Sequence, residues 1–259
     1  MNELSPELLG DFLNAKYVQY NQASFITSDP VQIPHLFTLK EDIEISGFMA
    51  ATIAWGQRKS IINNAHRLMR IMDDKPFDFI MQASEIELNL LRKFVHRTFQ
   101  GEDCLYFIRS LRNIYINHGG LNGVFAHGYQ QNNDINGALI YFRKIFFELE
   151  GLDRTRKHIS DVSKGSSAKR LNMFLRWMVR QDKHGVDFGI WKSIPASALY
   201  IPLDVHTGNV GRKLGLLTRK QSDWKSVNEL TCQLRKFDPS DPVKYDFALF
   251  GLGVFENFK

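Results

Sequence analysis

The chain has 259 residues, 44% of them hydrophobic, which is enough to bury a core in one large domain or in two lobes that share a hydrophobic seam. No apolar run approaches the roughly 18 residues of a membrane span, and acidic residues stand near the N-terminus where a signal peptide carries cations, so we expect a cytoplasmic protein. Cys104 and Cys232 lie far apart without a CxxC motif. They exclude a thiolate zinc site and a four-cysteine iron–sulfur cluster.

The formal net charge of +5 is unevenly distributed. From Arg154 to Lys225 there are fifteen Lys and Arg against five Asp and Glu, a balance of +10 that leaves −5 for the rest of the chain. A cationic region on a mildly acidic body concentrates attraction for phosphate groups. A solvated basic surface without a partner explains the same pattern, so charge alone leaves both interpretations open.

Helical periodicity runs through the first 150 residues. Ser5 as N-cap and Pro6 at the first position open the first predicted helix. Thr38 and Glu41 have capping-box spacing ahead of "DIEISGFMAATIAW", whose apolar content predicts a helix buried on most sides. Further helices are predicted over "RKSIINNAHRLMRIM", from near Pro76, from near Ser84, from Asp103, within "NHGGLNGVFAHGY" and over "INGALIYFRKIFFEL". No segment alternates with a period of two, so no strand is predicted.

The C-terminal third continues the helical pattern. It contains a predicted helix over "SSAKRLNMFLRWMVRQ", an irregular segment from Asp182 to Leu203, a helix after Asp204 and helices opened by Ser222 and by Asp241-Pro242. The predicted fold class is therefore all-α, in a single domain over 1–259. An irregular segment of about twenty residues in a compact domain is usually functional.

Two residues of the basic region suggest chemistry. Lys169 lies in the first turn of its helix if Ser166 or Ser167 is the N-cap, and there the helix macrodipole disfavours an ammonium. A neutral lysine amine can attack an electrophilic carbon and form a Schiff base, and a nearby carboxylate can stabilise a cationic sugar. Asp204 has a structural explanation as a helix cap worth roughly 1 kcal/mol. Lys169 has one as a side chain that extends to solvent.

The segment "GSSAK", followed by an apolar helix and then by "IPLDVHTGNVGRKLGLL", resembles a segment of the helix-hairpin-helix DNA glycosylases of the HhH-GPD superfamily. In that segment a G-x-G-x-K hairpin precedes a V-D-T-H-V or V-D-V-H sequence. "FMAATIAWGQRKSIINNAHRL" is similar to the end of the family's LLSQQT helix. Ser167 replaces the second hairpin glycine. Lys169 and Asp204 are 35 positions apart, longer than is usual and similar to the archaeal 8-oxoguanine glycosylase branch. As a whole the chain resembles a bacterial family of this type.

The resemblance implies a helix-hairpin-helix glycosylase-like fold of two helical lobes, approximately 55–150 and 1–54 plus 151–259, with a cleft between them. It implies that Lys169 attacks C1′ of a damaged nucleotide and that Asp204 assists. The expected DNA-binding residues are Gly165, Ser167, Arg170, His206, Thr207, Arg212 and Gln57. The expected pocket for a flipped base is built from Phe188, Trp191, Tyr200 and Trp55, although such aromatic residues more often belong to a core.

The expected activity is therefore that of a bifunctional glycosylase and AP lyase acting on a damaged base such as an oxidised purine. We expect damaged DNA as the partner, a monomer in the nucleoid-associated cytoplasm, and no membrane, metal, iron–sulfur cluster or other cofactor. Two alternatives remain at this point. One is a non-catalytic helical DNA-binding module, and the other is a structural or protein-interaction helical domain.

Overall fold

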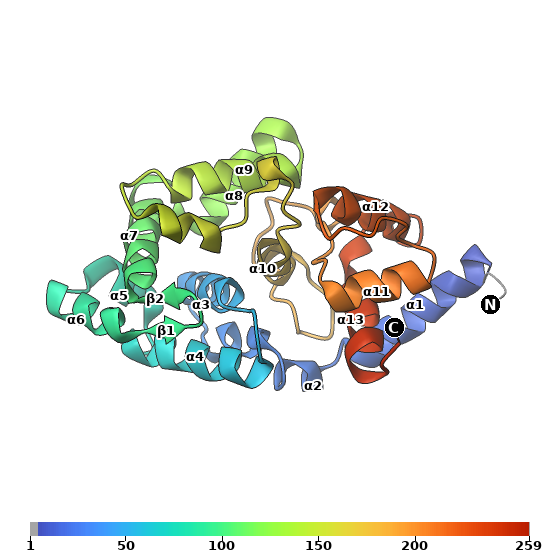
Figure 1. Cartoon of the computed structure of the whole chain (residues 1–259), viewed down its shortest axis with the longest axis horizontal. Coiled ribbons are helices and arrows are strands. Elements are labelled where there is room, and N and C mark those ends of the chain that lie inside the picture. The colour runs from blue at the N-terminus through green and yellow to red at the C-terminus, as the bar shows by residue number, and fades with distance from the viewer. Residues whose placement is uncertain (1–4, 259) are drawn as a thin grey trace. The chain divides into compact units, whose positions relative to one another are not determined.

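A computed structural model describes residues 5–258, and its chain forms two compact units that are considered separately below. Unit 1 comprises Met1–Thr27 and Val162–Lys259, and unit 2 comprises Ser28–Asp161. Both are built from helices, which confirms the predicted all-α class (Figure 1). The unit boundaries differ from the predicted lobes, because residues 28–54 and 151–161 belong to unit 2.

Unit 2 surrounds the helix that the sequence predicts to be buried. Its elements are α3 (Lys40–Thr52), α4 (Arg58–Ile71), α5 (Pro76–Gln82), α6 (Glu85–Leu90), β1 (Val95–His96), β2 (Phe99–Gln100), α7 (Gly101–Asn117), α8 (Gly120–Asn132) and α9 (Ile135–Phe146). Helix α3 is buried continuously from Ile43 to Thr52, as predicted. Phe48 of α3 packs against Phe107, Phe142 and Phe146, with ring centroids 5.5 to 6.0 Å away. These contacts explain why α3 belongs to unit 2.

Two local predictions in unit 2 are wrong. Helix α3 follows Leu39 as N-cap, which makes no side-chain hydrogen bond, so Thr38 is not the cap. Strands β1 and β2 form an antiparallel pair in which Val95 faces Gln100 and His96 faces Phe99. With two residues in each strand, the hairpin is too short to produce a visible alternation in the sequence.

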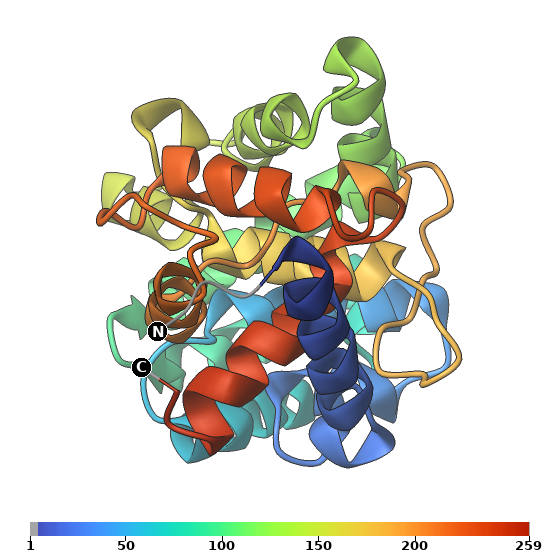
Figure 2. The same cartoon turned by 90° about the vertical axis from the view of Figure 1, so that its right-hand side faces the viewer.

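Unit 1 joins the N-terminal helices to the C-terminal third of the chain. Its helices are α1 (Pro6–Tyr20), α2 (Ala23–Ile26), α10 (Lys169–Val179), α11 (Val205–Lys213), α12 (Trp224–Arg235) and α13 (Tyr245–Phe255). As predicted, Ser5 caps α1, because its hydroxyl oxygen accepts a hydrogen bond from the Leu8 amide at 3.3 Å. Asp223 instead of Ser222 caps α12. Figure 2 shows α1 and α13 packed side by side.

Helix α10 is buried along almost its whole length, from Leu171 to Val179. The irregular segment after it contains only one short 3-10 turn, Ala196–Ala198, and folds back on the end of α10. The amides of Phe188 and Trp191 donate to the carbonyls of Trp177 and Met178 at 2.8 and 2.9 Å. The segment is therefore fixed by backbone hydrogen bonds rather than by regular structure.

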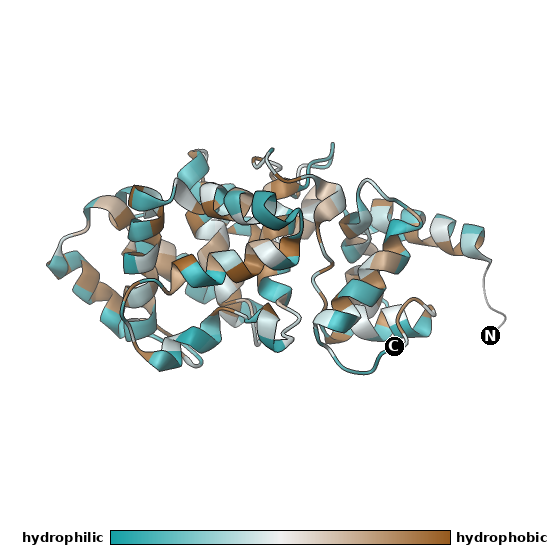
Figure 3. Cartoon of the chain, turned by 90° about the horizontal axis from the view of Figure 1, so that it is seen from above, coloured by the Kyte–Doolittle hydropathy of each residue, from teal (hydrophilic) through white to brown (hydrophobic). Residues whose placement is uncertain are grey.

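Figure 3 shows hydrophobic and hydrophilic residues alternating around the helices. Among residues 5–258, no helix combines the length and apolar character that crossing a bilayer requires.

Candidate functional site

The side chains of Lys169 and Asp204 meet in unit 1. Lys169 is the first residue of α10, and Asp204 is the N-cap of α11. The Lys169 Nζ lies 3.6 Å from Asp204 Oδ2, with the two side chains 29% and 21% exposed. The structure thus brings together the two residues that the sequence singles out, and leaves both partly open to solvent.

The turn before Lys169 depends on two residues with left-handed backbone. Gly165 has φ +84°, and Ala168, the N-cap of α10, has φ +47°. The Ser166 hydroxyl oxygen accepts a hydrogen bond from the Ala168 amide at 3.3 Å and so supports the turn. The prediction that Ser166 or Ser167 is the N-cap of α10 is wrong, because Ala168 takes that position. A three-residue 3-10 turn, Val162–Lys164, precedes Gly165. The turn therefore lies between a 3-10 turn and α10, and not between two long α-helices as the resemblance to a helix-hairpin-helix segment implies.

Asp204 uses its two carboxylate oxygens differently. Oδ1 accepts a hydrogen bond from the Thr207 amide at 2.9 Å, which caps α11. Oδ2 faces Lys169. Asp204 therefore caps α11 and pairs with Lys169 at the same time. A substitution can remove the charge that faces Lys169 and keep the oxygen that caps the helix.

We expect Asp204→Ala to lower the free energy of unfolding by about 1 kcal/mol, because it removes the cap of α11. Asp204→Asn keeps an oxygen that can accept from the Thr207 amide, so its loss should be smaller. Urea denaturation of both variants measures the difference. Equal losses in the two variants would mean that the charge facing Lys169, and not the cap, is what stabilises this end of α11.

Asp246, in the first turn of α13, is a nearby carboxylate that the sequence argument missed. It is buried and paired with the Arg176 guanidinium of α10. Burial raises the pKa of Asp246 to about 7, against the attraction of Arg176 and Lys169 and with a contribution from the negative charge of Asp204. The sequence feature that could have indicated a buried carboxylate is Arg176, a cation in the mostly apolar part of α10, because a buried arginine requires an acidic partner.

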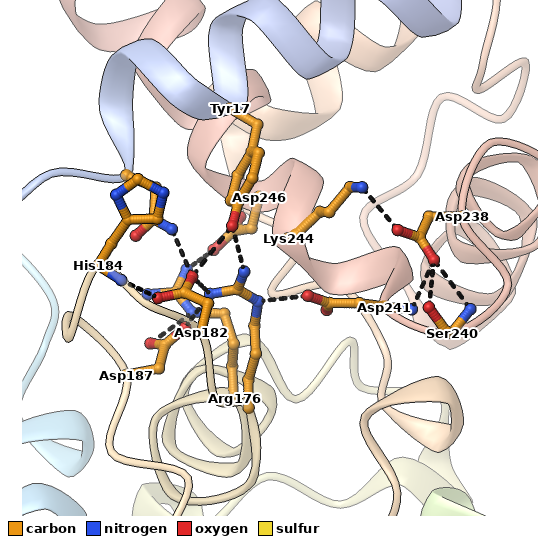
Figure 4. A network of polar contacts seen from close by, with 12 residues as sticks. Tyr17, Arg176, Asp182, His184, Asp187, Asp238, Ser240, Asp241, Lys244 and Asp246 are labelled. Atoms are coloured by element: carbon orange, nitrogen blue, oxygen red, sulfur yellow. Dashed lines mark hydrogen bonds and ion pairs between the residues drawn. The ribbon is translucent and has the colours of Figure 1, made fainter.

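Arg176 belongs to a buried network of charges, in which Asp187 pairs with Arg176 at 3.2 Å and with Arg180, the C-cap residue of α10, at 3.0 Å. Figure 4 shows Arg176 together with the carboxylates of this network. Arg180 pairs with Asp182 at 2.7 Å, Asp187 at 3.0 Å and Asp241 at 2.8 Å. Although burial opposes it, the Arg180 guanidinium holds the pKa of Asp182 down at about 2. Part of the positive charge counted between Arg154 and Lys225 is therefore neutralised inside unit 1.

The structure contradicts one of the predicted DNA contacts and gives a second residue a structural role. Thr207 is fully buried, including its hydroxyl, so it cannot reach a phosphate at the surface. The Arg212 guanidinium donates to the carbonyls of Arg219 and Lys220, each at 2.9 Å. Arg212 is half-buried and holds the loop after α11, and its contact with DNA stays a prediction.

The other predicted DNA-binding residues are at least partly exposed. Gly165 is exposed, and Ser167 and His206 are half-buried. Arg170 is half-buried as well, and burial of its guanidinium lowers its pKa to about 10. Gln57 is exposed and directly precedes α4 in unit 2. Their contact with DNA stays a prediction.

The predicted base pocket is only partly compatible with the structure. Trp191 is fully buried and packs edge-on against Phe174 at 5.4 Å, so it belongs to the core and cannot stack on a base without repacking. Tyr200 lies against Trp224 at 4.9 Å, with the Arg235 guanidinium 4.9 Å from its ring. Phe188 is half-buried in unit 1.

Trp55 is half-buried in unit 2, where its ring meets His96 edge-on at 5.0 Å. Its part in a base pocket stays a prediction. Within residues 5–258, no cluster of three or more His, Cys, Asp or Glu is arranged to hold a metal ion.

The fold defines a predominantly helical protein whose unit 1 carries a partly exposed lysine–aspartate pair at two helix starts. The chain belongs to the family described as "Protein of unknown function (DUF2400)", which matches residues 29–255. No curated protein and no solved structure matches the chain.

Proposed function

We propose that this protein is a DNA N-glycosylase with AP lyase activity, which removes a damaged base such as an oxidised purine through a Schiff base on Lys169. The observation that carries the proposal is the distance of 3.6 Å between Lys169 Nζ and Asp204 Oδ2, with both side chains partly exposed. An amine and a carboxylate this close can act on one sugar carbon, the amine as nucleophile and the carboxylate as counter-charge.

The reaction requires Lys169 as a neutral amine. Its Nζ forms a bond to C1′ while the bond from C1′ to the base breaks, and the base leaves with that electron pair and takes up the proton that the substituted amine releases. The bond from C1′ to O4′ then breaks as the nitrogen forms a double bond to C1′, which gives a protonated Schiff base, and O4′ takes up a proton from water. Water accepts a proton from C2′, and the electron pair of that bond expels the 3′ phosphate and cleaves the strand.

Asp204 contributes electrostatically, because its Oδ2 lies beside the amine that attacks C1′. A carboxylate fixed there stabilises the positive charge that develops on the sugar as the base departs. The hydrogen bond from the Thr207 amide to Oδ1 holds the carboxylate in place, so its orientation does not depend on the substrate.

The charge of the two units supports a polyanionic substrate. Unit 1 contains 17 Lys and Arg against 12 Asp and Glu, a net charge of +5, whereas unit 2 contains 16 of each. The whole net charge of the chain therefore belongs to the unit that carries Lys169 and Asp204. Phosphate binding by such a unit should weaken steeply as salt increases.

The test is covalent trapping on DNA. Duplexes that carry 8-oxoguanine, other base lesions or an abasic site are incubated with the protein and borohydride, which reduces a Schiff base to a stable amine. We expect a covalent protein–DNA adduct, and strand cleavage when borohydride is omitted.

Two results would overturn the proposal in different ways. Salt-sensitive DNA binding without any adduct would indicate a non-catalytic DNA-binding module. Failure to bind DNA even at low salt would indicate a structural or protein-binding domain in which Lys169 and Asp204 form an ordinary ion pair.

A further inference from the structure

Asp246 is a buried carboxylate that the proposed reaction does not use. It is 6% exposed and ion-paired with Arg176. Arg176 follows Lys169 by seven residues on α10, which places the two residues on the same face of the helix about 10 Å apart along its axis. Asp246 therefore contacts the side of α10 that carries the proposed nucleophile.

The charges that act on Asp246 come from the elements packed around it. Arg176 and Lys169 of α10 attract its carboxylate, whereas Asp204 at the start of α11 and Asp187 in the segment after α10 repel it. On the α1 side of the same network, the Tyr17 hydroxyl oxygen accepts a hydrogen bond from the Arg180 guanidinium at 2.9 Å. Since burial is the largest influence and raises the pKa of Asp246 to about 7, this carboxyl exchanges its proton near neutral pH.

The protonation of Asp246 changes the electrostatic balance at Lys169. As a carboxylate, Asp246 attracts the Lys169 ammonium and offsets the positive charge of Arg176. As a neutral acid it does neither, and Arg176, which Asp187 still pairs with at 3.2 Å, then repels the ammonium more strongly than before. Both changes have the same sign, because each favours the neutral amine when Asp246 holds a proton.

We propose that Asp246 is a positioning residue that regulates the charge of Lys169, holding the amine as an ammonium when ionised and releasing it for attack when protonated. This inference rests on the proposed function, in which the neutral amine is the nucleophile. Asp246 acts through Lys169, and the only bond that it makes or breaks is the one to its own proton.

Acetylation of Lys169 measures this regulation without DNA. Acetic anhydride reacts with unprotonated amines, so the rate at which Lys169 is modified, followed by mass spectrometry of its peptide, reports the neutral amine. We expect Asp246→Asn to raise this rate about three- to tenfold at about pH 8, the size expected for removing one partly screened charge nearby. An unchanged or slower rate would overturn the proposal.

Two further variants separate regulation from general damage to the buried network. Asp246→Glu restores the charge and should acetylate Lys169 close to the wild-type rate. Asp241→Asn also removes a carboxylate of the network, but this half-buried carboxylate pairs with Arg180 at 2.8 Å and not with Arg176. It should leave the rate unchanged, and a rise as large as that of Asp246→Asn would assign the effect to loosening of the fold.

The wild-type protein provides a measurement that does not depend on the folding of a variant. Ionisation of Asp246 near pH 7 should strengthen the hold on the Lys169 proton while the pH rises. The acetylation rate of Lys169 should therefore increase less than tenfold per pH unit around neutrality, and a full tenfold increase throughout would overturn the proposal.

Adduct trapping on abasic DNA keeps the two proposals distinguishable. Absence of a Lys169-dependent adduct would reject the glycosylase function, while the acetylation rates would still decide whether Asp246 controls the amine. An adduct together with unchanged acetylation in Asp246→Asn would keep the function and reject the regulation.

Discussion

Lys169→Ala is expected to abolish the covalent adduct with abasic-site DNA, because no other group would supply the attacking amine in the proposed reaction. Lys169→Arg should lose the adduct as well, since a guanidinium keeps the positive charge but remains protonated. The comparison of these two variants separates the nucleophile from the charge. Borohydride trapping followed by denaturing electrophoresis measures the adduct.

The fold should survive both substitutions. The Lys169 side chain is 29% exposed, and an ion pair of this kind contributes at most about 1 kcal/mol. Lys164→Ala is the matched control, because Lys164 is an exposed lysine just before the same turn and is not paired with Asp204. An adduct that persists in Lys169→Ala, or disappears in Lys164→Ala, would contradict the assignment of the nucleophile.

The pairing of Lys169 with Asp204 shows what the sequence could predict. Both residues mark helix starts, which are local features, and the resemblance to one segment of a glycosylase family suggested that they share a site. The cap of α11 followed from residue types alone. The cap of α10 did not, because Ala168 takes a left-handed conformation that glycine adopts more readily than alanine.

The errors concern side chains whose environment depends on distant residues. The sequence shows Trp191 in a glycine- and proline-containing segment, but not that Phe174 covers its ring. The sequence also does not show that the loop after α11 brings two backbone carbonyl groups to the Arg212 guanidinium. Asp246 gave no local signal, since its significance comes from burial against Arg176 of another helix. Periodicity identifies elements, but it cannot assign these long-range partners.

Arg180→Met is expected to have the largest effect on stability, lowering the free energy of unfolding by about 3 to 5 kcal/mol. Arg180 is almost completely buried and pairs with Asp182, Asp187 and Asp241. Methionine fills similar space without a charge, so buried Asp187 and half-buried Asp182 and Asp241 would lose their shared partner. Lys183→Met, a substitution of an exposed lysine in the adjacent segment, should change the free energy of unfolding by no more than about 0.5 kcal/mol. Chemical denaturation compares the two.

The cost of Arg180→Met should also depend on pH, and the sign follows from Asp182. Its pKa is about 2 in the folded protein, below the ordinary value of 3.8, so it contributes stability above about pH 4 that is lost as the pH falls toward 2. Arg180→Met removes the charge that holds this pKa low. The difference in stability between wild type and variant should therefore be largest near pH 7 and shrink as the medium is acidified. A difference that stays constant with pH would assign the loss to packing of the long arginine side chain, and the buried network would then stabilise unit 1 through its shape more than through its charges.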